Sequence, residues 1–236
     1  MPITVSNAGE RPGDNVLWQP SGQQCQDAAL TAFAGFLADR GFGPFPDYPS
    51  LHAFSIDDRE AFWSALWDFV PIRAANKGDV VAQHVDTFPG QDQPRVRWFP
   101  EARLNFAENL LRYRDDRVAL VSLLENGQRR EMTYAQLYTE VDRVAAALVA
   151  SGVGPGDRVA GFMPNVIETV VAMLATTSLG GVWSSCSPDF GINGVLDRFG
   201  QIEPKVLFSA DGYYYNGKAC DSLERLAAIV AAIPSL

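Results

Sequence analysis

The spacing of apolar residues predicts helices in the first part of the chain. Within residues 27–41, apolar side chains recur three and four positions apart, which is the period of a helix with one buried face (Leu30, Phe33, Ala34 and Leu37). A second helix with a broad apolar face is predicted between Ser55 and Pro71, because proline cannot continue a helix. Residues 72–100 keep no period and are rich in turn residues, so they are predicted to form a long connection.

Beyond a short predicted helix at residues 102–113, strand-length apolar runs alternate with runs of helical period. Strands are predicted at residues 118–124, 158–163, 181–185 and 206–209, and helices at residues 133–150, 166–179, 192–202 and 222–232. Asn126-Gly127 predicts a hairpin that turns the first strand back on residues 129–132. Repeated strand–helix units predict a parallel sheet covered by helices. The predicted fold class is therefore α/β with a helical N-terminal extension.

Three segments follow from these patterns. Residues 1–15 are polar and contain glycine and proline, so they are predicted to form a flexible arm. Residues 16–114 are predicted to be a helical extension and linker, and residues 115–236 are predicted to form the α/β part. The charged run at residues 114–117 marks the expected boundary.

Composition narrows the class of protein. The chain is 47% hydrophobic and 20% charged, as expected of a globular protein, and its net charge of -9 disfavours a nucleic-acid partner. The apolar stretch at residues 166–179 is too short and polar to span a bilayer, and residues 1–7 do not resemble a secretory signal. We therefore expect a cytoplasmic enzyme, or part of one, that binds neither nucleic acid nor membrane.

Several motifs that could suggest a catalytic or phosphate-binding site are better explained by the fold. The glycines between Gly152 and Gly156 follow a helix and precede a strand, whereas a phosphate loop must open a helix; they are predicted to end the helix and form a turn. Thr133 and Gln136 match a capping box. Cys186 is predicted to be a packing residue, because no histidine lies near it in the sequence. No catalytic residue and no metal site is assigned, since the three cysteines and two histidines lack the spacing of a metal cluster.

Small and polar residues follow the third predicted strand of the α/β part. Ser187, Pro188 and Asp189 lie where this strand ends, and ligands of open α/β sheets bind at the carboxyl ends of the strands. The structural alternative is that Ser187 or Asp189 caps the helix that follows. The sequence leaves both interpretations open.

The loop after the next strand contains three tyrosines and a lysine. Tyr213, Tyr214 and Tyr215 have aromatic faces that stack on a purine ring, and the ammonium group of Lys218 attracts phosphate. Alternatively, the tyrosines only cover an edge of the sheet. This loop is a second candidate ligand site.

Long phrases of the sequence resemble a known family of ligases. The phrases are WFPEARLNFAENLL at residues 98–111, MPNVIE at residues 163–168, and GVWSSCSPDFG at residues 181–191 with its continuation to residue 205. They resemble the acetoacetyl-CoA synthetase branch of the adenylate-forming ligases, and the resemblance extends over residues 17–236.

The resemblance implies an activity and a set of binding residues. Such ligases join acetoacetate to ATP as an acyl-adenylate, with magnesium, release pyrophosphate, and pass the acyl group to coenzyme A. In relatives, the loops that match residues 187–189 and 215–218 lie along the coenzyme A nucleotide. Ser187, Pro188, Asp189, Tyr215 and Lys218 are thereby implied as coenzyme-binding residues, although Tyr215 stands where acetyl-CoA synthetases tend to have an arginine.

Other segments of the family have no counterpart in the sequence. It contains no Ser/Thr/Gly-rich run that ends in lysine, no Tyr-Gly-x-Thr-Glu-like segment, and no C-terminal catalytic lysine of the family type. We therefore expect an N-terminal portion, truncated before the phosphate loop and inactive by itself, so that ATP, magnesium and coenzyme A serve the full-length enzyme. Two alternatives stay open: a non-catalytic coenzyme A-binding or assembly module, and a ligase for another short or branched acid.

Overall fold

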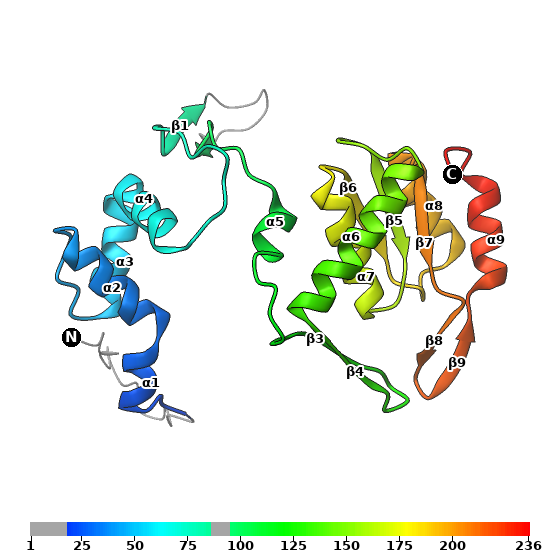
Figure 1. Cartoon of the computed structure of the whole chain (residues 1–236), viewed down its shortest axis with the longest axis horizontal. Helices are drawn as coiled ribbons and strands as arrows, with labels where there is room; N and C mark the ends of the chain where they lie inside the picture. The colour runs from blue at the N-terminus through cyan, green and yellow to red at the C-terminus, as the bar shows by residue number, and fades with distance from the viewer. Residues whose placement is uncertain (1–17, 86–94) are drawn as a thin grey trace, which may run out of the picture. The chain divides into compact units, whose positions relative to one another are not determined.

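The computed structural model describes residues 18–85 and 95–236, which belong to two compact units, Met1–Arg103 and Leu104–Leu236 (Figure 1). The arm predicted at residues 1–15 lies outside the described residues, as do residues 86–94 of the predicted connection. Among the residues that the structure describes, no helix is long and apolar enough to cross a membrane.

Helices and one hairpin make up the N-terminal unit. Its elements are α1 (Gly22–Asp27), α2 (Ala29–Asp39), α3 (Tyr48–Asp57), α4 (Arg59–Phe69), and the antiparallel strands β1 (Ala82–Val85) and β2 (Arg95–Trp98). Helices α2, α3 and α4 bury a common cluster of Phe33, Ala34, Leu37, Leu51 and Ala65. The helices predicted from the apolar period are therefore present as α2 and α4.

Helices α1 and α3 and strands β1 and β2 of this unit were not predicted. Helix α3 occupies a stretch in which only Leu51 is buried, so its apolar pattern is too weak to predict a helix. Its start is set instead by Asp47, whose side chain accepts the backbone N–H of Ser50. Strands β1 and β2 lie within the predicted connection, because strands of four residues do not produce a visible period.

The C-terminal unit is an α/β structure. Its elements are α5 (Phe106–Leu110), β3 (Val118–Leu123), β4 (Arg129–Thr133), α6 (Tyr134–Ala150), β5 (Arg158–Phe162), α7 (Ile167–Ser178), β6 (Val182–Cys186), α8 (Ile192–Ile202), β7 (Val206–Ser209), β8 (Gly212–Tyr215), β9 (Lys218–Asp221) and α9 (Leu223–Ala232). Strands β6, β5 and β7 form a parallel sheet in that order. The predicted fold class is confirmed.

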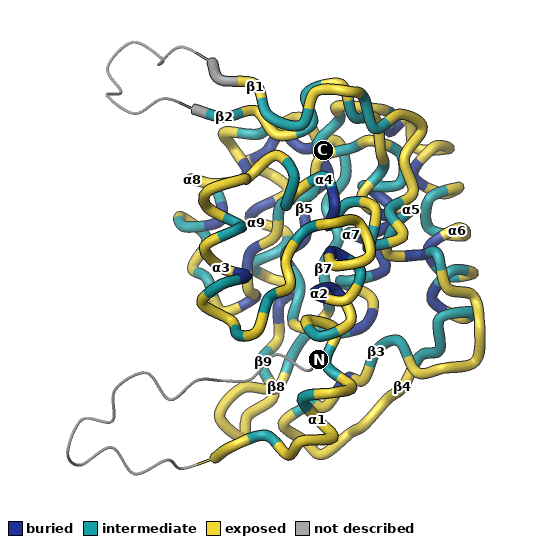
Figure 2. Tube along the Cα trace, turned by 90° about the vertical axis from the view of Figure 1, so that its left-hand side faces the viewer, coloured by how far each residue is buried: buried dark blue, intermediate teal, exposed yellow. Residues whose placement is uncertain are grey.

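Helices cover both faces of the parallel sheet, because the side chains of the central strand alternate between them. Val159 of β5 packs in a cluster with residues of α5, α6 and α7. Ala160 and Phe162 pack instead in a cluster with residues of α8 and α9. Figure 1 shows these helices around the sheet, and in Figure 2 the hairpins β3–β4 and β8–β9 are drawn mostly as exposed or intermediate. The two hairpins are therefore more exposed than the central strand β5, which is buried.

The glycine-rich turn after α6 joins this helix to the central strand. Helix α6 begins with the predicted capping box, since Thr133 and Gln136 exchange side-chain and backbone hydrogen bonds. It is followed by Gly152 at a φ of 80°, a left-handed conformation that glycine adopts without strain. The predicted helix end and turn are confirmed, and the glycines are not a phosphate loop.

Candidate functional site

The first candidate loop follows the end of strand β6. Ser187 and Asp189 are exposed, whereas Pro188 between them is buried. Helix α8 has Gly191 as its N-cap and no side-chain cap, so the alternative that Ser187 or Asp189 caps this helix is wrong. Neither side chain forms a hydrogen bond within the described part of the chain. Both polar groups are therefore accessible to a ligand.

The second candidate loop is a hairpin rather than an irregular loop. Strands β8 and β9 pair antiparallel, and Tyr215 lies opposite Lys218 at the turn. Asn216 and Gly217 form this turn with φ values of 50° and 72°, as a two-residue hairpin turn requires. The Asn-Gly signal that predicted the other hairpin was present here too. Its flanking strands had been assigned to a loop because they are only four residues long.

Exposure differs among the three consecutive tyrosines of β8. Tyr213 is half-buried, whereas Tyr214 and Tyr215 are 50% and 59% exposed. The side chain of Lys218 is exposed, and no ion pair to it is found among the described residues. The tip of the hairpin thus presents an aromatic ring and an unpaired ammonium group to solvent.

Arg225 connects the two candidate loops. Its Nη1 donates a hydrogen bond of 2.8 Å to the carbonyl oxygen of Pro188, in the first loop. Its Nη2 lies 3.3 Å from the carbonyl oxygen of Asp221 and 3.5 Å from the hydroxyl of Tyr213, both in the hairpin. Arg225 was not predicted from the sequence. Nothing in the local pattern of α9 indicates that an arginine there contacts a loop 37 positions earlier.

A hollow of about 610 Å³ lies between the two hairpins of the C-terminal unit. It is lined by Leu123, Leu124, Glu125, Pro164, Asn165, Val166, Asp211, Gly212, Tyr213, Tyr214, Ala219, Cys220 and Asp221. Three of these residues are acidic, and none of the five predicted coenzyme-binding residues is among them. The Glu125 carboxylate accepts the backbone N–H of Gly217 at 3.3 Å, which joins the hairpin turn to the β3–β4 turn.

An ion pair lies at the N-terminal end of α7, at the rim of a second hollow of about 790 Å³. Arg130 donates a hydrogen bond of 2.7 Å to the carboxylate of Glu168. Partial burial by itself raises the pKa of Glu168. The hydrogen bond from Arg130 and a backbone hydrogen bond together outweigh this effect, so the pKa of Glu168 is lowered. The glutamate of the MPNVIE phrase is therefore a paired carboxylate and not a free proton acceptor.

Cys186 occupies a core position at the end of β6. It is 4% exposed and packs with Phe162 and Val195. Burial raises the pKa of its thiol, and a raised pKa makes the reactive thiolate scarce at neutral pH. The predicted packing role is confirmed.

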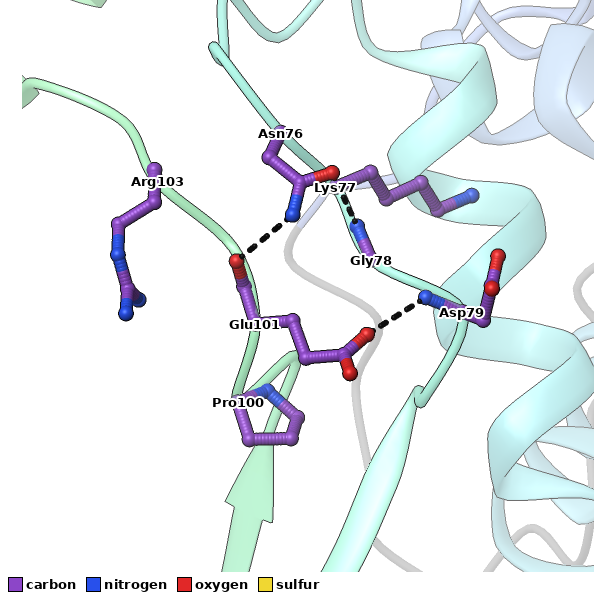
Figure 3. Close-up of a pocket in the computed structure, with 7 residues that line it drawn as sticks. All are labelled: Asn76, Lys77, Gly78, Asp79, Pro100, Glu101 and Arg103. Carbon is purple, nitrogen blue, oxygen red and sulfur yellow. Dashed lines mark hydrogen bonds between the residues drawn. The ribbon is translucent and has the colours of Figure 1, made fainter.

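The N-terminal unit has a polar hollow of about 670 Å³ (Figure 3). Within it, Asn76 donates a hydrogen bond to the carbonyl oxygen of Glu101, and the Glu101 carboxylate accepts the backbone N–H of Asp79 at 2.9 Å. Lys77 points away and pairs with Asp68 at 2.7 Å. Because these polar groups are bonded to protein partners, we interpret the hollow as a structural connection between two chain segments.

Within residues 18–85 and 95–236, no group of three or more histidine, cysteine, aspartate or glutamate residues is placed to hold a metal ion.

Two family models match the chain. The model of the AMP-binding enzyme family matches residues 106–235, and the model of the acetyl-coenzyme A synthetase N-terminus matches residues 48–110. The matched parts meet at α5, whose bounds are Phe106–Leu110.

Individual relatives are named as synthetases of coenzyme A derivatives. The chain is 41% identical to an acetoacetyl-coenzyme A synthetase of Rhizobium meliloti over 95% of its length, and 36% identical to a malonamoyl-CoA synthetase of Penicillium aethiopicum, also over 95%. It spans 33% and 31% of these relatives, about a third of their length. The structure of an acetoacetyl-CoA synthetase from Streptomyces lividans matches 93% of the chain, which corresponds to 34% of that protein, with a TM-score of 0.84 and 41% identity.

The similarity is therefore not limited to short motifs. The structural match extends over nearly all of the chain, and it agrees with the parallel α/β layers of the C-terminal unit. Because the matched residues 106–235 are more than half of the 236 residues, the chain belongs to the AMP-binding enzyme family.

Proposed function

We propose that the chain is the N-terminal part of an acetoacetate–CoA ligase. The observation that supports the proposal most directly is the 41% identity to acetoacetyl-CoA synthetases over almost the whole chain. The proposed reaction of the complete enzyme joins acetoacetate and ATP to an acyl-adenylate, with magnesium, and then transfers the acyl group to coenzyme A. These three small molecules are its proposed substrates and cofactors.

Within this enzyme, we assign residues 16–114 to a helical extension and linker, and residues 115–236 to the first parallel strand–helix units of the adenylation domain. The α/β layers formed by β5, β6 and β7 support the second assignment. The net charge of -9 supports the absence of a nucleic-acid partner, and a cytoplasmic location stays a prediction. This division of the chain, with an arm at residues 1–15, stays a prediction.

The proposed role of the two loops is to form one wall of a coenzyme A channel. Ser187, Pro188, Asp189, Tyr215 and Lys218 are the proposed coenzyme-binding residues. Their chemistry fits the nucleotide end of coenzyme A, since an exposed tyrosine offers a face for stacking and an unpaired ammonium group attracts phosphate. The acidic hollow beside the hairpin would repel phosphate, so we expect the phosphates on the Lys218 side.

An exchange assay tests the catalytic part of the proposal. The purified chain is incubated with acetoacetate, ATP, magnesium and labelled pyrophosphate, and the acetoacetate-dependent exchange of label into ATP is measured. We expect no exchange, because the sequence has no run like the family's phosphate loop. The Rhizobium meliloti relative is the positive control. Turnover by the chain alone would contradict this expectation.

Calorimetry with coenzyme A tests the binding part. A saturable complex with the folded chain supports the coenzyme wall, and Lys218→Met is expected to weaken it about tenfold through the loss of one phosphate contact. Lys77→Met is the matched control, because Lys77 pairs with Asp68 in the other unit. Equal affinities of both variants would contradict the assignment of Lys218.

Two alternative functions have distinct outcomes. A non-catalytic coenzyme A-binding or assembly module would bind coenzyme A tightly as a stable monomer and would have no ligase segments encoded downstream of residue 236. A ligase for another acid is favoured by the likeness to the malonamoyl-CoA synthetase. A panel of short and branched acids, assayed with the enzyme that contains this chain, distinguishes it from an acetoacetate ligase.

A further inference from the structure

Arg225 lies in the first turns of helix α9 and reaches two segments that are far apart in the sequence. Its guanidinium group donates to the carbonyl oxygen of Pro188 at 2.8 Å and to the carbonyl oxygen of Asp221 at 3.3 Å. Because the guanidinium is planar and its N–H groups have fixed directions, one arginine can fix the separation of two carbonyl groups. A lysine, with one flexible ammonium group, holds such a geometry less well.

The surroundings of the guanidinium group strengthen these bonds. Arg225 is half-buried, and its guanidinium carbon lies 5.8 Å from the ring centre of Tyr213 and 6.0 Å from that of Phe162. Aromatic faces attract a cation and exclude water from it. Pro188 is buried, so loss of its donor would leave the carbonyl oxygen without a partner among the described residues.

These contacts are made in the middle of the first proposed coenzyme loop and at the open end of the hairpin. Pro188 lies between the accessible side chains of Ser187 and Asp189. Asp221 pairs with Gly212 at the open end of the hairpin, whereas Tyr215 and Lys218 pair at its tip. Arg225 therefore binds the backbone of both loops, including the carbonyl oxygen of Pro188, and forms no hydrogen bond with the side chains of Ser187, Asp189 or Lys218 among the described residues.

We propose that Arg225 is a positioning residue, which holds the loop at residues 187–189 and the β8–β9 hairpin at the separation that coenzyme A requires. This inference rests on the coenzyme A wall proposed above and extends it to a residue of α9. Arg225 is proposed to act through the backbone of the two loops, by its bonds to the carbonyl oxygens of Pro188 and Asp221, and not by contact with the coenzyme.

The test combines coenzyme A calorimetry with amide hydrogen exchange on the full chain. The variants are Arg225→Met, Arg225→Lys and the matched control Arg143→Met. Among the described residues, Arg143 pairs with Glu140 of its own helix, at 2.6 Å, and with no other side chain. We expect Arg225→Met to weaken coenzyme A binding about tenfold, and Arg225→Lys to weaken it less. Exchange should rise at residues 187–191 and 212–221 in Arg225→Met and stay unchanged there in Arg143→Met.

Each outcome bears on a different statement. If Arg225→Met binds coenzyme A like the unchanged chain, or loosens α9 but neither loop, the positioning role is overturned while the coenzyme wall stands. If the unchanged chain already fails to bind coenzyme A, the proposed wall is contradicted and the positioning role falls with it. A lower unfolding temperature of Arg225→Met with unaltered affinity would mean a purely structural role, which also overturns the inference.

Discussion

At the scale of the residue, Asp157 shows how a single carboxylate ties together segments of the C-terminal unit. It accepts a hydrogen bond from Lys205 at 2.7 Å and the backbone N–H of Gly154 at 2.8 Å. These bonds, that of Lys205 foremost, lower the pKa of Asp157. A carboxyl group whose pKa is lowered on folding stabilises the fold above its unfolded pKa, and this contribution is lost as the pH falls through the folded pKa.

The substitution Asp157→Asn is therefore expected to lower the unfolding temperature at neutral pH. The difference in unfolding temperature between the variant and the unchanged chain should shrink below about pH 4, where an unfolded aspartate becomes protonated. It should vanish at still lower pH. Thermal unfolding from about pH 7 to pH 2 measures it. Asp142→Asn is the control, because Asp142 is exposed and has no ion pair in the described chain. A deficit that did not change with pH would disprove the linkage.

A second residue-scale prediction concerns Gly78 in the polar hollow of Figure 3. Its φ is 78°, and a Cβ atom there would lie 2.5 Å from atoms of the Glu101 side chain. Gly41 has a similar φ of 84° but open space around the same position. Alanine at residue 41 should cost about 1 kcal/mol through backbone strain alone, and alanine at residue 78 about 2–4 kcal/mol because overpacking is added.

Chemical denaturation of both variants, followed by tryptophan fluorescence, measures this difference. Trp63, Trp67 and Trp98 report on the same unit. Equal losses of stability would mean that the contact with Glu101 is relieved without cost, contrary to the expectation.

At the scale of the element, helix α6 depends on its N-terminal cap. Thr133 accepts the backbone N–H of Gln136, and the Gln136 side chain accepts the backbone N–H of Thr133. Thr133→Ala should destabilise the chain by about 1 kcal/mol, since the backbone N–H of Gln136 loses its side-chain acceptor. Thr139→Ala in the same helix is the matched control, because its hydroxyl only donates to the Ala135 carbonyl and should matter little.

Equilibrium unfolding in urea measures both threonine variants. The prediction fails if Thr139→Ala is as destabilising as Thr133→Ala, because the loss would then not be specific to the cap; by helix propensity alone, alanine is favoured over threonine.

At the scale of the whole molecule, stability depends on a few separate buried clusters. Leu148 of α6 is 3% exposed and belongs to the cluster that joins α5, α6 and α7 to the sheet. Leu148→Ala should cost about 2–5 kcal/mol, because it removes buried methyl groups and leaves a cavity. Leu223→Ala makes the same change at a side chain that is 53% exposed, and should cost less than about 0.5 kcal/mol.

The loss of stability in both leucine variants is measured by amide hydrogen exchange of the most strongly protected amides in residues 104–236. Comparable protection in the two variants would show that this cluster does not limit the stability of the C-terminal unit.

The sequence by itself determined the elements whose signals are local. The spacing of apolar residues predicted α2, α4 and the alternation of β5, α7, β6, α8 and β7. This was possible because the apolar residues of each element lie within one short segment of the chain. The capping role of Thr133 and the turn at Gly152 were also predicted, since a cap and a left-handed turn depend on residues only a few positions apart. The resemblance to the ligase family likewise needed only continuous phrases.

Tertiary structure decided what depends on residues far apart in the chain. The strands of β1–β2 and β8–β9 are too short for a period, so their pairing, rather than their composition, makes them strands. The sequence left two roles open for Ser187 and Asp189, a helix cap and a ligand site. The structure excludes the cap, because Gly191 is the N-cap of α8. The contact of Arg225 with Pro188 spans 37 positions and arises only when α9 packs against the sheet, because no local pattern encodes which loop a helix meets.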